Sequence, residues 1–110
     1  MKVRLELHPE AVHEVDAAVD WYEGQRAGLG AEFFAELRRS LRVIAENPRA
    51  CPPWPGGRAR DLEVRRLLME RFPFALPYLV LEELVVVLAV AHVRRRPGYW
   101  LQRVRPLRQR

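Results

Sequence analysis

A histidine and three consecutive arginines lie near the C-terminal end of the sequence, with a tyrosine shortly after them. The residues are His92, Arg94, Arg95, Arg96 and Tyr99. Side chains of these types can cleave RNA without a metal ion. In that chemistry one group takes the proton of the 2′-hydroxyl, another protonates the leaving oxygen, and arginines stabilise the extra charge on phosphorus. A simpler interpretation makes His92 a strand-end histidine hydrogen-bonded to backbone and pairs the arginines with an acidic protein partner. The spacing alone leaves both interpretations open.

Other kinds of chemistry have little support in the sequence. It contains no glycine-rich phosphate loop ahead of a helix, no Gly-x-Ser-x-Gly motif and no His-Glu-x-x-His motif, so we expect no cofactor. Cys51 is the only cysteine, which excludes an intramolecular disulfide, and no histidine lies near it in sequence to activate it as a nucleophile. The histidines are scattered at positions 8, 13 and 92, so we expect no bound metal.

Charge is distributed unevenly along the chain. Residues 1–50 carry seven basic and nine acidic side chains, a net charge of −2, whereas residues 51–110 carry twelve basic and five acidic ones, a net charge of +7. Residues 94–110 hold seven arginines and no acidic residue. This asymmetry indicates a polyanionic or acidic partner. A basic end of this kind can equally be a disordered, solubilising tail.

The length of 110 residues suits one domain, and a hydrophobic content of 49% supplies enough apolar material for a core. We expect a single domain over residues 1–101 and a basic C-terminal tail over residues 102–110. The longest apolar run, Leu84 to Ala91, is eight residues, far below the ~20 that a transmembrane helix needs. The first ten residues alternate apolar and polar side chains rather than forming a signal peptide. We therefore expect a cytoplasmic protein with no membrane partner.

The first half of the chain predicts a strand followed by a helical hairpin. Residues 2–7 alternate apolar and polar side chains, which is typical of a half-buried strand. A helix should begin at Pro9, with an exposed acidic face (Glu10, His13, Glu14, Asp16, Asp20) and an apolar stripe (Val12, Val15, Val19, Tyr22). A short glycine-rich connection leads to a second helix that ends at Asn47-Pro48, and its apolar stripe is Phe33, Leu37, Leu41 and Ile44.

The second half predicts a loop and three strands. Residues 47–60 are rich in proline and glycine, a composition that argues against helix or central strand. Strands should follow over residues 62–71, 74–81 and 84–93, with Glu82-Glu83 as the turn of a hairpin and the last, valine-rich strand in the centre. We expect an α+β fold of βααβββ order, in which a helical hairpin packs on a mainly antiparallel four-stranded sheet. Residues 99–101 should add a short C-terminal turn or helix.

Short motifs occur along the chain in a distinctive order. They are Pro9-Glu10-Ala11, Trp21-Tyr22-Glu23, Gly28-Leu29-Gly30 with Phe33, Asn47-Pro48, Phe72-Pro73-Phe74, Tyr78, and His92-x-Arg94-Arg95-x-Pro97-x-Tyr99-Trp100. In this order, over roughly residues 3–101, the sequence resembles the RelE/ParE superfamily, the toxins of bacterial type II toxin-antitoxin systems. The resemblance implies the same βααβββ fold. It also implies a small cognate antitoxin that covers and blocks the toxin, and contact with operator DNA only through that antitoxin.

The superfamily divides by target. RelE-like members cleave mRNA in the ribosomal A site with basic groups on the sheet and a C-terminal Arg and Tyr, whereas ParE-like members poison DNA gyrase without nuclease chemistry. Arg95 matches the RelE-type arginine, Tyr99 matches its tyrosine approximately, and Ala75 stands where an arginine is frequent. The predicted sheet also offers three candidate phosphate contacts, Arg65, Arg66 and Arg71. Two acidic residues, Glu63 and Glu70, interrupt them in sequence.

The Trp21-Tyr22 pair, the Gly28-Leu29-Gly30 turn and the Tyr99-Trp100 ending resemble the ParE or plasmid-stabilisation branch more closely. We therefore favour a ParE-like gyrase inhibitor that is not an enzyme, with target contacts at Arg94, Arg95, Arg96, Tyr99 and Trp100. The alternative is a RelE-like, ribosome-dependent, metal-independent endoribonuclease in which His92, Arg95 and Tyr99 are catalytic. A second alternative is an inactive module that binds an antitoxin and poisons nothing.

Overall fold

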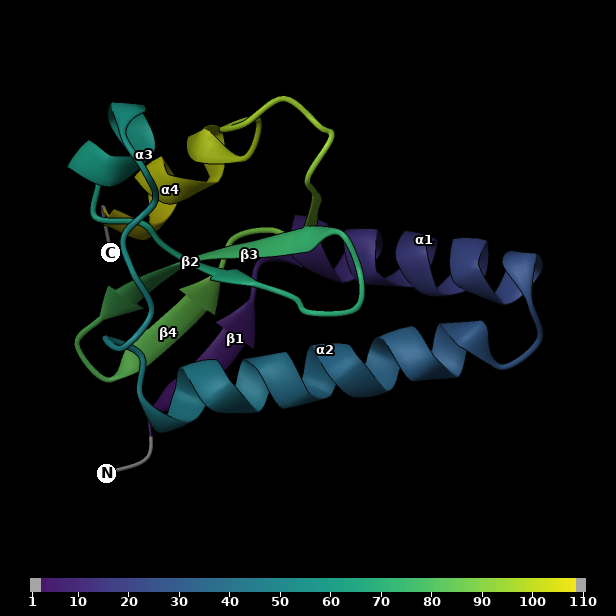
Figure 1. The fold of residues 1–110 in the computed structure, drawn as a ribbon. Helices are drawn as coiled ribbons and strands as arrows, with labels where there is room; N and C mark the ends of the chain where they lie inside the picture. The colour runs from purple at the N-terminus through teal and green to yellow at the C-terminus, as the bar shows by residue number, and fades with distance from the viewer. Residues whose placement is uncertain (1–2, 109–110) are drawn as a thin grey trace.

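The computed structural model describes residues 3–108, which form one sheet with a layer of helices on each of its two faces (Figure 1). In chain order the elements are β1 (Arg4–Leu7), α1 (Pro9–Gln25), α2 (Leu29–Glu46), α3 (Gly57–Asp61), β2 (Arg65–Leu68), β3 (Phe74–Leu81), β4 (Leu84–Val87), β5 (Ala91–His92), a 3₁₀ turn η1 (Leu101–Arg103) and α4 (Val104–Arg108). The predicted α+β class and helical hairpin are confirmed. The start of the predicted first strand, Lys2, lies outside the described residues.

Helix α1 begins where the sequence predicts, but it buries a different face. The His8 side chain caps the helix by accepting a hydrogen bond from the Glu10 backbone N–H, at 3.1 Å. The buried side chains are Ala11, Val15 and Ala18, whereas Val12, which the predicted stripe included, is 44% exposed. Two small alanines give a weak signal in an apolar pattern, yet they allow the helix to lie close to the sheet.

The turn between α1 and α2 depends on two glycines. Gly28 has a φ of 91°, in the left-handed region that favours glycine. At Gly30 a Cβ atom would lie 2.7 Å from the Val19 carbonyl oxygen, so only glycine lets the two helices approach this closely. The Glu23 carboxylate accepts hydrogen bonds from the N–H groups of both glycines. On α2 the predicted stripe is confirmed, with Leu41 only partly buried.

The sheet has the strand order β1-β4-β3-β2, with β5 paired to β3. It is mainly antiparallel as predicted, and the pairing of β1 with β4 is parallel. Strand β3 has the predicted bounds, and the β3–β4 hairpin turns at Glu82-Glu83, where Glu82 adopts a φ of 54°. The predicted strand over residues 62–71 is shorter, because only β2 pairs with β3.

The predicted strand over residues 84–93 is divided into β4 and β5 by a bulge. Tyr78 pairs with Val87 and Ala75 pairs with Ala91, so three steps along β3 match four steps along the other strand. One extra residue therefore bulges out between residues 88 and 90. Pro77 faces this interruption and has no N–H to donate, although its carbonyl accepts from the Leu88 N–H at 2.8 Å.

The second face of the sheet is covered by α3 and the C-terminal segment (Figure 1). The prediction of a loop without helix over residues 47–60 is wrong at its end: Gly56 and Gly57, both with positive φ, turn the chain into α3, and Ala59 is buried on the sheet. Part of the expected tail over residues 102–110 is helical, since η1 and α4 pack on the same face through Val104 and Leu107. Residues 109 and 110 lie outside the described residues.

Candidate functional site

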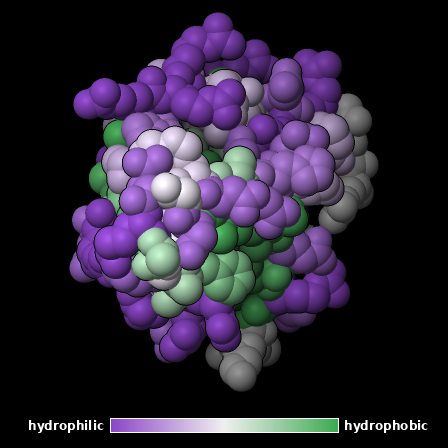
Figure 2. All heavy atoms as spheres, turned by 90° about the vertical axis from the view of Figure 1, so that its right-hand side faces the viewer, coloured by the Kyte–Doolittle hydropathy of each residue, from purple (hydrophilic) through white to green (hydrophobic). Residues whose placement is uncertain are grey.

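A groove of about 560 Å³ lies between α1 and the end of the sheet that carries β5. Its lining is mainly apolar. It includes Trp21, which is 60% exposed, together with His92 and Arg95. The remaining lining residues are Glu14, Ala17, Ala18, Tyr22, Pro73, Phe74 and Val90. On the side of the molecule where the helical hairpin turns, hydrophobic side chains are framed by hydrophilic ones (Figure 2). An apolar groove with a few polar groups at its edge suits the burial of a partner's apolar side chains.

At one end of this groove the Glu14 carboxylate joins α1 to the C-terminal segment. It accepts hydrogen bonds from the Tyr99 hydroxyl at 2.7 Å and from the Val90 N–H at 2.9 Å. The Arg103 guanidinium contacts both carboxylate oxygens, at 3.1 and 3.3 Å, and also donates to the Leu88 carbonyl at 2.9 Å. Glu14 and Arg103 therefore satisfy the backbone groups that the bulge leaves without a strand partner.

The predicted position of Glu14 on the exposed acidic face of α1 is wrong. Its side chain is 15% exposed, and that of Arg103 is 11% exposed. The available signal was helical spacing, because Glu14 is three residues after Ala11 and four before Ala18, both of which are buried. No pattern in the sequence connects Glu14 to Arg103, since the contact depends on the path of the chain between β5 and α4.

Tyr99 and Arg95 belong to the same network of contacts around the Glu14 carboxylate. The Arg95 guanidinium carbon lies 3.7 Å from the centroid of the Tyr99 ring, and an Arg95 nitrogen lies 3.8 Å from a Glu14 oxygen. Burial, and then the hydrogen bond to Glu14, raise the pKa of Tyr99 above its ordinary value. The phenol is therefore protonated at neutral pH and is committed to a carboxylate of its own chain.

His92 ends β5 in the way the simpler interpretation describes. Its Nδ1 atom accepts a hydrogen bond from the Arg94 N–H at 3.1 Å, and its ring packs edge-on against Phe74 at 5.2 Å between centroids. Arg94 and Arg96 are exposed in the loop that follows. Trp100, which we expected among the target contacts, is 1% exposed and packs against Trp54 in the core. Its side chain stabilises the fold and is not available on the surface.

The three candidate phosphate contacts lie in separate environments. Arg65 donates to the carbonyl oxygens of Arg49 and Cys51, at 3.1 and 2.6 Å, and so fastens the proline-rich loop to β2. Arg66 lies over the Trp54 ring at 5.6 Å, and Arg71 pairs with Glu32 at 2.9 Å. Ala75 is buried in β3. The side chains do not converge on a common phosphate position.

The described part of the chain offers no cluster of three or more His, Cys, Asp or Glu side chains that could hold a metal ion. None of the helices within residues 3–108 is long and apolar enough to cross a membrane.

The fold is that of a small α+β protein in which a helical hairpin packs on a mainly antiparallel sheet, and comparison with known proteins identifies the family. Residues 5–97 match the family described as the ParE toxin of type II toxin-antitoxin systems, and the chain belongs to that family. It is similar in fold to a solved structure described as the chromosomal ParDE toxin-antitoxin system from P. aeruginosa, with a TM-score of 0.72 and 18% identity, over 84% of this chain and 98% of that chain. Among curated proteins no match was found. The resemblance to the RelE/ParE superfamily, on its ParE-like side, is confirmed.

Proposed function

We propose that this toxin is neutralised by a small cognate antitoxin and, when free of it, inhibits DNA gyrase. Membership of the ParE toxin family supports the toxin assignment. We assign the choice of target and the mode of neutralisation from the residues of the site. The protein then acts by binding and not by catalysis.

The observation that carries this choice is the internal pairing of the groups that a nuclease would need. The Tyr99 hydroxyl donates to Glu14, and Arg95 stacks on the Tyr99 ring. The raised pKa keeps the Tyr99 phenol protonated at neutral pH, and its proton is already donated to Glu14. His92 already uses Nδ1 to accept a backbone hydrogen bond. These commitments favour a binding surface over acid–base catalysis.

The exposed residues of this region supply the proposed contact with gyrase. Arg94, Arg95 and Arg96 are exposed in the loop after β5, and Arg95 lines the apolar groove. Tyr99 positions Arg95 through the ring contact at 3.7 Å. Exposed charges of this type steer association and are screened by salt, so we expect gyrase inhibition to weaken gradually as the arginines are removed.

The antitoxin is proposed as the protein partner, with operator DNA reached only through it. The two edges of the main sheet are β1 and β2, while β4 lies between β1 and β3. Addition of an antitoxin strand is therefore open at β1 or β2 and closed at β4, which is paired on both sides. The start of the β2 edge is already covered, because Arg66 donates its N–H to the Pro52 carbonyl.

The test compares two reactions of the purified, antitoxin-free protein. A gyrase inhibitor should stop supercoiling and accumulate cleaved DNA held by gyrase, while ribosome-bound mRNA stays intact. Replacing Arg94, Arg95 and Arg96 by alanine should reduce inhibition in steps, and the loss should be larger at low salt than at high salt, where the wild-type charge contacts are already screened. The replacement His92→Ala should leave inhibition within about twofold of wild type, because a gyrase inhibitor that acts by binding needs no proton transfer from the imidazole.

The competing proposal is a ribosome-dependent nuclease, with His92 beside Arg95 at the groove rim. Primer extension would then show discrete cuts in ribosome-bound mRNA. Proton transfer typically contributes ~10² to 10⁴-fold, so His92→Ala or Tyr99→Phe should abolish cutting while antitoxin binding is retained. Protein that binds antitoxin and affects neither gyrase nor mRNA would instead be an inactive binding module.

A further inference from the structure

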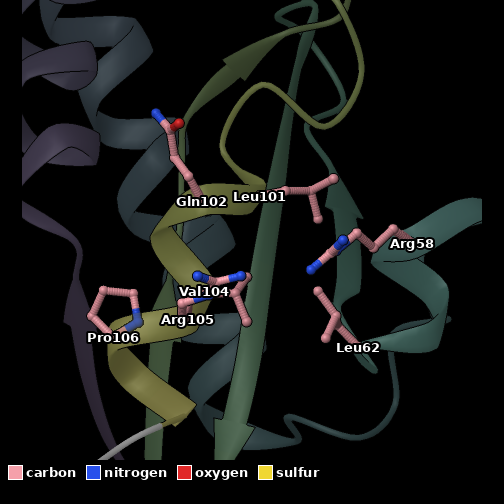
Figure 3. Close-up of a pocket in the computed structure, with 7 residues that line it drawn as sticks. All are labelled: Arg58, Leu62, Leu101, Gln102, Val104, Arg105 and Pro106. Carbon is pink, nitrogen blue, oxygen red and sulfur yellow. The ribbon is translucent and has the colours of Figure 1, made fainter.

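A second groove lies on the other side of the sheet from the helical hairpin, between α3 and the C-terminal segment. It has a volume of about 690 Å³. Arg58 on α3 and Leu62, directly after it, extend toward Leu101 and Val104 on the opposite wall (Figure 3). Gln102, Arg105 and Pro106 complete the lining. Neither the proposed gyrase contact nor the first groove uses these residues.

The two walls are fixed by buried anchors. Ala59 holds α3 on the sheet, and Val104 and Leu107 hold α4 beside it. Arg103 adds its hydrogen bonds to Glu14 and to the Leu88 carbonyl. The groove is therefore formed before any partner arrives, which lowers the entropic cost of binding.

The lining combines four apolar side chains with two arginines and no carboxylate. A nucleic acid would be expected to meet aromatic side chains for base stacking, and none lines this groove. An apolar strip flanked by arginines instead complements a peptide segment with apolar residues on one face and Asp or Glu beside them. Residues 51–110, which form both walls, carry the net charge of +7.

The C-terminal wall is built from residues that follow the family match, which ends at residue 97. The groove therefore combines a family-matched element, α3, with a segment outside the match. This origin suits a contact that distinguishes one partner from others of its class.

We infer that the groove between α3 and α4 binds an acidic, amphipathic segment of the cognate antitoxin, separately from the surface that meets the toxin's target. The inference rests on the proposed function, since it requires an antitoxin. Arg58 and Arg105 pair with carboxylates of that segment, and Leu62 and Leu101 receive its apolar side chains.

The experiment measures the affinity of the purified toxin for the antitoxin encoded by the neighbouring reading frame, by calorimetry at two salt concentrations. The test variant is Arg58→Glu with Arg105→Glu, both at exposed positions. The matched control is Arg38→Glu with Arg42→Glu, a pair of exposed arginines on α2. Equal thermal midpoints for the two variants would establish equal folding.

The test variant should bind the antitoxin at least about tenfold more weakly at low salt, whereas the control should stay within about twofold of wild type. Antitoxin binding should also protect backbone amides of α3 and of residues 101–107 from hydrogen exchange. The antitoxin-free test variant should inhibit gyrase as wild type does.

Wild-type affinity in the test variant, or unprotected amides in both walls, would overturn the inference and leave the proposed function intact. Failure of the wild-type toxin to bind the antitoxin at all would contradict the proposed function itself. Loss of gyrase inhibition with unchanged antitoxin affinity would assign the groove to the target. Binding of single-stranded RNA that the test variant abolishes, or a wild-type dimer that it dissociates, would assign the groove to RNA or to a second copy of the chain.

Discussion

Replacing Glu14 with alanine should destabilise the protein more than any other single change at an acidic residue of α1. The carboxylate accepts hydrogen bonds from Tyr99, Val90 and Arg103 at 2.7 to 3.3 Å. Hydrogen bonds that involve a charged group contribute about 1.5–3 kcal/mol, and breaking a buried ion pair by removing one partner costs about 3–5 kcal/mol. The Glu14 side chain is 15% exposed and that of Arg103 is 11% exposed. We therefore expect the lower end of the range for breaking a buried ion pair, about 3 kcal/mol.

Urea unfolding followed by circular dichroism gives the free energy of unfolding of wild type and variant. The isosteric change Glu14→Gln keeps an acceptor and removes the charge, so its cost should be smaller, about 1–2 kcal/mol. Asp16→Ala, at an exposed position of the same helix, is the matched control and should stay within about 0.5 kcal/mol of wild type. A cost below about 1 kcal/mol for Glu14→Ala would refute the view that this carboxylate holds the C-terminal segment on the bulge.

Three further changes test the packing and the site. Leu37→Ala, at a side chain 1% exposed, should cost about 2–5 kcal/mol in urea unfolding, whereas Val43→Ala at an exposed position should change the free energy of unfolding little; equal costs would mean that the buried face of α2 is misassigned. Gly30→Ala should lower the thermal midpoint, because the new Cβ atom would lie 2.7 Å from the Val19 carbonyl oxygen. An unchanged midpoint would show that α1 and α2 can move apart at this position without loss of stability. The raised pKa of Tyr99 means that its contribution to stability is complete below the ordinary value of 10.0 and is lost as the pH rises through the folded-state value. Titration of tyrosine absorbance, with Tyr99→Phe as the reference, should therefore assign to Tyr99 a pKa above 10.0, and ordinary titration would contradict the buried hydrogen bond.

The elements that sequence reasoning located well are those defined by their own local pattern. Strand β3 is an apolar run between Pro73 and the Glu82-Glu83 turn, and its predicted bounds agree with the structure. Helix α2 has a clear apolar stripe and ends before Asn47-Pro48 as predicted. In both cases the signal lies within the element, so no knowledge of neighbouring segments was needed.

The features that sequence reasoning missed depend on contacts between distant segments. The bulge that divides β4 from β5 follows from the register of β3, and its unpaired backbone groups are satisfied by Glu14 and Arg103 from elsewhere in the chain. Trp100 looked like a surface contact, yet α3 and the loop around Trp54 give it a buried position. A periodic pattern records which residues share a face, and it carries no information about which distant segment covers that face.

We propose that the toxin acts by binding gyrase and not by cutting RNA. The most direct measurement places antitoxin-free wild-type protein in parallel gyrase and translation reactions, and maps DNA breaks and mRNA 5′ ends in each. We expect gyrase-held DNA breaks, no codon-specific mRNA cuts, and no effect of His92→Ala on either outcome. Codon-specific mRNA cuts by the wild-type protein, abolished by His92→Ala, would contradict it.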